Sequence, residues 1–114
     1  MHVGRLLAIL LLLTACGGND ANPPEGCTDP VAATTVELAD FAFRPDCLSA
    51  DAGATITLDN TGDAPHTFTV TGTDVDFDLD AGSSVDASLS GVEPGVYVVT
   101  CTYHPQMEAS LTVG

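Results

Sequence analysis

The sequence predicts an all-β domain, an antiparallel Greek-key sandwich or barrel of about seven to eight strands. Two observations support this fold class. The segment from Asp74 to Asp80 alternates strictly, with apolar residues on one face and four carboxylates on the other, which is the pattern of a half-buried strand. Turn-forming Gly, Asp, Asn and Pro residues separate it from other segments with the same period. Short strands at such spacing are typical of sandwiches and barrels.

The other expected strands follow in order along the chain, and no helical period interrupts them. They span residues 34–38, 54–59, 66–71, 84–89, 96–101 and 109–113, with turns at 51–53, 60–63, 80–82 and 93–95. In the first region, Val36 and Leu38 share one parity. The following Phe41 and Phe43 take the other parity. Because side chains two apart in a strand point the same way, we expect a bulge or bend near Asp40.

The first 15 residues have the pattern of a signal peptide. Arg5 precedes an apolar run at residues 6–13, and small residues follow it. This run is too short to span a bilayer, which needs about 20 apolar residues. The alternative, a buried core helix, is disfavoured because the run is followed by Gly, Asn, Asp and Pro residues with no helix signal.

Residues 13–16 (LTAC) resemble the lipobox of bacterial lipoproteins. The resemblance implies cleavage after residues 1–15 and acylation of Cys16, and several acyl chains on one residue give stable anchoring. Residues 16–26 would then form a lipidated, flexible tether. The domain at 27–114 would lie on the extracytoplasmic side of a bacterial membrane, in the periplasm or at the cell surface. The alternative is an ordinary secreted protein whose cleavage site lies near Cys16.

The segment at residues 101–107 (CTYHPQM) holds a thiolate, an imidazole and a thioether. With a second imidazole, these groups make the trigonal copper site, with a long axial Met, that transfers single electrons. His66 is the remaining candidate, because His2 lies in the predicted leader. The sequence has two methionines, Met1 and Met107, and Met1 lies in the predicted leader. The predicted ligands are therefore His66, Cys101, His104 and Met107.

Strand parity brings these ligands toward one end of the predicted sandwich. Cys101 is the last residue of an alternating apolar set, whereas His66 and Met107 each begin one. If His66 opens a strand antiparallel to the one that Cys101 closes, their side chains can meet at that end. His104 is expected in the loop between Cys101 and Met107, from which it can reach the same point.

Residues 101–107, together with 60–67 (NTGDAPHT) and 41–45 (FAFRP), resemble the small blue, or type 1, copper proteins of the plastocyanin, amicyanin and pseudoazurin group. The resemblance covers residues 34–114 and implies the cupredoxin fold with one type 1 copper ion per chain. It implies equatorial ligands at His66, Cys101 and His104 and an axial ligand at Met107. It also implies that His104 lies near the surface as the electron route. The chain departs from this group in having no Trp and an additional cysteine pair.

The four cysteines are expected to have different roles. With Cys16 assigned to lipid and Cys101 to metal, Cys27 and Cys47 remain, and in an oxidising compartment we expect them to form a disulfide. By the loop-entropy relation such a bond adds on the order of 3 kcal/mol to stability. The alternative is a pair of buried free thiols.

The function expected from these residues is electron transfer between extracytoplasmic redox proteins by a membrane-tethered monomer, without enzymatic activity. A copper oxidase or nitrite reductase would need a second copper centre, and the chain has no further His for one. Three alternatives stay open: a domain that buffers or delivers copper, a zinc site, and a metal-free interaction module in which Cys101 and Met107 are core residues.

The strong negative charge bears on the choice of partner. The sequence carries 16 acidic and 2 basic residues, for a formal net charge of −14, and loss of Arg5 with the leader would leave Arg44 alone. Such a charge disfavours binding to nucleic acid and favours a redox partner with a basic docking surface. The alternative is that the acidity serves only solubility or a salty habitat.

Overall fold

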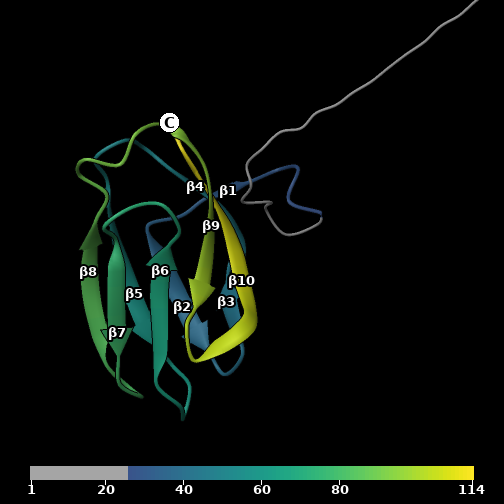
Figure 1. Ribbon diagram of the computed structural model, residues 1–114, viewed down its shortest axis with the longest axis vertical. Helices are drawn as coiled ribbons and strands as arrows, with labels where there is room; N and C mark the ends of the chain where they lie inside the picture. The colour runs from purple at the N-terminus through teal and green to yellow at the C-terminus, as the bar shows by residue number, and fades with distance from the viewer. Residues whose placement is uncertain (1–25) are drawn as a thin grey trace, which may run out of the picture.

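The computed structural model describes residues 26–114 as a sandwich of two sheets (Figure 1). The first sheet has the order β1 (Val31–Ala32), β4 (Cys47–Ala50), β10 (His104–Val113), β9 (Gly95–Cys101), β6 (His66–Val70), β7 (Asp76–Leu79). The second has the order β3 (Ala42–Arg44), β2 (Thr35–Ala39), β5 (Thr55–Asn60), β8 (Ser84–Ser88). Within residues 26–114, no helix is long and apolar enough to cross a membrane. The predicted signal peptide and the lipid site at Cys16 lie outside the described residues.

The predicted all-β sandwich is confirmed, and two details differ. The described part of the chain forms ten strands rather than seven to eight, because β1, β3 and β4 have two to four residues each and are too short to show a period. The pairing is also not purely antiparallel. The pairs β1/β4, β4/β10 and β2/β5 are parallel, since the chain crosses between the sheets instead of returning by a hairpin each time.

The core lies between the sheets and contains the inward-facing sets that the sequence predicts. Phe68 and Val70 of β6, and Val99 of β9, are buried. They face apolar residues of the second sheet, and the rings of Phe43 and Phe68 meet edge to face with centroids 5.9 Å apart. The same alternation continues in β10 through Met107, Ala109, Leu111 and Val113. This continuity fixes which side chains point inward at the strand ends.

The bend predicted near Asp40 is present as a turn between β2 and β3. Phe43 enters the core after the turn, whereas Phe41 stays 58% exposed. Phe41 has a φ of 75°, a left-handed conformation that is rare for a bulky residue. The turn therefore places Asp40 and Phe41 outside the core, at the end of the second sheet.

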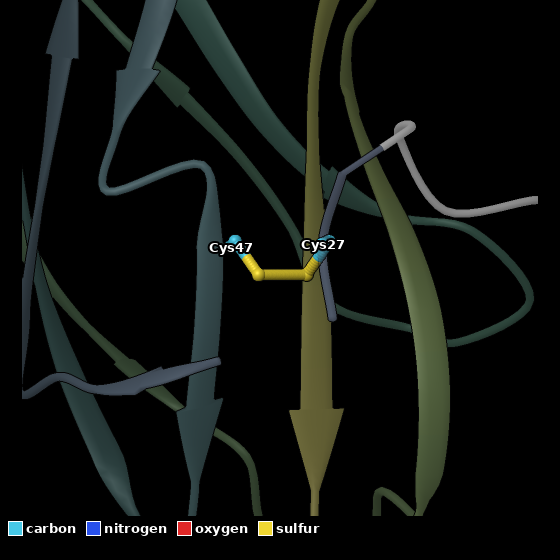
Figure 2. The surroundings of a disulfide bond; sticks show 2 residues. All are labelled: Cys27 and Cys47. Carbon is cyan, nitrogen blue, oxygen red and sulfur yellow. A yellow bond between two sulfur atoms is a disulfide. The ribbon is translucent and has the colours of Figure 1, made fainter. Parts of the chain in front are cut away.

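The predicted disulfide between Cys27 and Cys47 is present (Figure 2). Cys47 is the first residue of β4, and Cys27 precedes β1. The bond therefore ties the segment that precedes the sandwich to a strand paired with β10.

Candidate metal centre

The predicted ligands gather where three strands of the first sheet begin or end. In Figure 1, β9 ends and β10 begins at the lower end of the sandwich, opposite the C-terminus. The neighbouring β6 runs antiparallel to β9, with Val70 opposite Val99. His66 at the start of β6 therefore lies beside Cys101 at the end of β9, as the sequence predicted.

His66, Cys101 and His104 form one cluster, with one ligand atom from each residue lying within 4.8 Å of the others. His66 and Cys101 are buried, and His104 is partly buried. His66 Nδ1 lies 3.9 Å from Cys101 Sγ. The structure thus brings together three of the four residues that the sequence singled out, in a cluster able to hold a metal ion.

His104 differs from the expectation in one respect, because it is the first residue of β10 rather than part of a loop. It pairs with Cys101, and the register then shifts before Glu108. Pro105 directly follows His104 and has no N–H to donate to a ladder, which favours such an irregularity. Met107 lies within the shifted segment and is 1% exposed. It begins the inward-facing set of β10, as predicted.

The polar atoms of the cluster fit a bound metal. Among the buried side-chain nitrogens and oxygens of residues 26–114, His104 Nε2 alone has no hydrogen-bond partner. An unpaired buried polar atom is costly, and a metal ion would satisfy it. Cys101 Sγ accepts a hydrogen bond from the backbone N–H of Thr67 at 3.3 Å. Two imidazoles, a thiolate and a nearby buried thioether are the donors of type 1 copper.

Asn60 braces the loop that leads to His66. Its side-chain amide donates to the carbonyls of Ala64 and Leu79 at 3.0 Å each, and its Oδ1 accepts from the N–H of Gly62 at 2.9 Å. Asn60 is itself fully buried. Two of these three hydrogen bonds hold the backbone that precedes the ligand, and the third joins Asn60 to the end of β7, a role that the sequence motif alone did not assign.

Asp40 contacts the site from the second sheet, which sequence reasoning missed. Its Oδ1 lies 2.9 Å from His66 Nε2, and its carboxylate accepts from the N–H groups of Asp63 and Ala64. The hydrogen bond from Asp63, followed by the one from His66, holds the pKa of Asp40 below its usual value of 3.8. The sequence predicted only a bend near Asp40, because a sequence separation of 26 from His66 hides the contact from any local pattern.

Phe41 borders the two imidazoles, and Tyr103 directly precedes His104 in the chain. The ring of Phe41 lies 4.8 Å from that of His104 and 6.3 Å from that of His66, and the two imidazole rings are 5.1 Å apart. Tyr103 is 49% exposed, and its hydroxyl donates to the carboxylate of Asp78. This hydrogen bond, with the cost of burial and the charge of Asp78, raises the pKa of Tyr103 above its usual value of 10.0.

Comparison with known proteins matches this fold. The sequence pattern described as the cupredoxin-like domain matches residues 5–113. The chain is 29% identical over 113 residues to the methylamine utilization protein MauL of Methylophilus methylotrophus, covering 95% of this chain and 65% of that protein. It therefore spans slightly less than two thirds of that relative's length.

Two solved structures show the same fold. A purple cupredoxin from Nitrosopumilus maritimus superposes with a TM-score of 0.60 at 20% identity, over 71% of this chain and 99% of that one. The Cu(I) form of an amicyanin variant superposes with a TM-score of 0.59 at 22% identity, over 83% and 94% of the two chains.

Proposed function

The chain belongs to the family of cupredoxin-like domains, and on that premise we propose that it is a type 1 copper protein that carries single electrons between extracytoplasmic redox proteins. The observation that carries the proposal is the cluster of His66, Cys101 and His104 with its unpaired buried nitrogen. Met107, buried at the start of the inward-facing set of β10, is the proposed axial ligand. These donor types together match a blue copper centre.

The copper ion, when bound, supplies the one-electron couple. The protein contributes a donor set that its fold holds in advance. Cys101 is fixed by strand pairing and by the N–H of Thr67, and His66 is held at its far nitrogen by Asp40. Because these supports come from the protein itself, they would present the same donor positions to Cu(I) and to Cu(II), which favours fast electron transfer. His104 is more exposed than His66 or Cys101 and is the proposed route for electrons.

The arrangement favours a carrier over an enzyme. Four protein ligands would fill the coordination positions of the copper, and catalytic metal sites keep a position open for water or substrate. The matched amicyanin is a copper protein of similar length to this chain. The sequence offers no further His in its mature part for a second copper centre.

The remaining parts of the proposal concern anchoring and partners. A lipid at Cys16 would hold the domain on the outer face of a bacterial membrane, and the lipobox-like sequence supports this. The sequence has 16 acidic and 2 basic residues, and this negative charge supports a partner with a basic docking surface. Phe41 and Tyr103, both exposed, are the proposed apolar contacts beside His104.

The deciding experiment is Cu(II) titration of the full chain, exported to an oxidising bacterial compartment and extracted in detergent, followed by visible and EPR spectroscopy. We expect an intense charge-transfer band and narrow copper hyperfine splitting at one copper per chain. Cys101→Ser should abolish the band, whereas the matched Cys27→Ser/Cys47→Ser variant should keep it. A colourless protein without stoichiometric copper would refute the proposal. Copper bound without a reversible redox couple would instead favour a copper-delivery role.

A further inference from the structure

We propose that Asp40 is a positioning residue that aims His66 at the metal, and that its negative charge lowers the reduction potential of the site. This inference rests on the proposed copper function. It assigns a role to a residue of the second sheet that contributes no ligand. Four observations, on the ring of His66, the loop before it, the space at Gly62 and the charge of the carboxylate, lead to it.

The two nitrogens of His66 face different groups. Nδ1 lies 3.9 Å from Cys101 Sγ, whereas Nε2 lies 2.9 Å from Asp40 Oδ1. Because a carboxylate only accepts hydrogen bonds, Nε2 carries the proton. The lone pair of Nδ1 is then directed toward Cys101 Sγ and the rest of the cluster. A hydrogen bond at the outer ring nitrogen sets the tautomer and orientation of a ligand His in this way.

The same carboxylate also holds the loop that carries His66. Oδ2 of Asp40 accepts from the N–H of Asp63 at 3.0 Å, and Oδ1 accepts from the N–H of Ala64 at 3.2 Å. His66 is fully buried, while the side chain of Asp40 is 33% exposed. One carboxylate therefore ties the backbone before the ligand and the ligand ring to the turn between β2 and β3, which belongs to the opposite sheet.

Gly62 leaves the space in which the Asp40 carboxylate sits. A Cβ at position 62 would lie 2.2 Å from Asp40 Oδ1, 2.8 Å from its Cγ and 3.0 Å from its backbone nitrogen. An alanine there must displace the carboxylate. The backbone of Gly62 is not among the positive-φ glycines, so an alanine is permitted conformationally and acts as a steric probe of the contact.

The charge of Asp40 bears on the redox couple. A carboxylate hydrogen-bonded to a ligand imidazole stabilises the more positive Cu(II) state over Cu(I), and it does so at short range in a partly buried site. Asp40→Asn keeps an oxygen acceptor of the same shape and removes the charge. We therefore expect the blue band to persist and the equilibrium with a redox mediator to shift about tenfold toward Cu(I), which is 59 mV for a one-electron couple.

The matched control is Asp63→Asn, which removes the same charge from the loop. The hydrogen bond to His66 comes from Asp40, so this control leaves it in place. It should shift the potential by less than half as much as Asp40→Asn. Asp40→Ala removes both charge and acceptor, and should weaken Cu(II) binding by about 10- to 100-fold, the usual cost of losing an outer partner of a metal ligand. Equal potentials for wild type and Asp40→Asn, with the blue band intact, would overturn the proposal.

Gly62→Ala provides an independent test. In the wild-type background it should raise the potential, because it displaces the carboxylate. In the Asp40→Ala background it should have little effect on the potential, and this non-additivity identifies the contact. Additive shifts would contradict the proposed role.

A measurement on the metal-free full chain separates this inference from the copper function. Nitrogen-15 NMR of His66 should show the Nε2–H tautomer in wild type and its loss in Asp40→Ala. The Nδ1–H tautomer in wild type would refute the positioning role even if copper binds. Failure of wild type to form a blue site would refute the proposed function, while the tautomer would still decide the role of Asp40.

Discussion

The ring of Phe41 packs against the ring of His104, with centroids 4.8 Å apart and planes inclined by 40°. Phe41 reaches this position from the second sheet through a backbone with a φ of 75°. Strained conformations of this kind persist where surrounding structure holds them, often at functional sites. The turn at Asp40 and Phe41 thus supplies both an outer hydrogen-bond partner for one imidazole and an aromatic contact for the other.

Substitutions at Phe41 should separate the free-energy cost of its left-handed backbone from the stability that its ring contact contributes. Phe41→Ala and Phe41→Gly both remove the ring, but only glycine relieves the left-handed backbone, whose cost for other residues is roughly 1–2 kcal/mol. Part of that gain is offset by the greater freedom of glycine in the unfolded chain. We expect the glycine variant to be more stable than the alanine variant by about 1 kcal/mol in urea unfolding of the metal-free protein. An alanine variant as stable as the glycine variant, or more stable, would show that the backbone at Phe41 is not strained.

Copper should stabilise the folded protein through the cluster. Binding to the native state alone adds about 2.7 kcal/mol when free metal is a hundredfold above the dissociation constant. Thermal unfolding should therefore shift upward on loading and return after chelation. Cys101→Ser is the control, and an equal upward shift in that variant would show that copper stabilises the protein at another place.

Loss of the Cys27 to Cys47 disulfide should lower stability without altering the copper spectrum. The bond closes a loop of sequence separation 20, for which the loop-entropy relation gives about 3 kcal/mol. Cys47 pairs with Ser110 in the register of β10, well along the strand from His104. Denaturant unfolding of the double serine variant measures the first effect, and its visible band measures the second. A bleached band would show that the two regions are coupled.

The Tyr103 hydroxyl should ionise above pH 10.0, because its hydrogen bond to Asp78 raises its pKa. The stability from this bond is fully present below the unfolded pKa and is lost as pH rises through the higher folded pKa. In the Tyr97→Phe background, Tyr103 is the one tyrosine left in the sequence, so phenolate absorbance reports on it alone. Adding Asp78→Asn should lower the midpoint. An unchanged midpoint would exclude Asp78 as the cause.

Because the protein is strongly acidic, the rate of electron transfer should depend on the sign of the charge on a small redox reagent. A small cationic oxidant such as tris(phenanthroline)cobalt(III) should react faster as salt is lowered, whereas anionic ferricyanide should react more slowly. Opposite charges attract over distances that salt screens. Stopped-flow formation of the blue band from the reduced, copper-loaded protein gives both rates. Identical salt dependence for the two reagents would show that the charge does not act near the electron route.

Local patterns predicted much of the fold and of the cluster. The strict alternation around Phe77 and the inward phase of Phe68 and Val99 are properties of single strands, and the structure confirms them. The short β1, β3 and β4 were not predicted, because two to four residues carry no readable period. The start of β10 at His104 was missed because Pro105 and the shifted register interrupt its alternation.

By itself, the sequence determined which residues can bind copper and that parity places His66 and Cys101 at one end of the sandwich, because ligand chemistry and strand period are local properties. Only the tertiary structure decided what surrounds them. Asp40 contacts His66 over a sequence separation of 26, and its carboxylate fits only because Gly62 has no side chain. Such contacts depend on how one sheet packs on the other, and no pattern along a single strand records that distance.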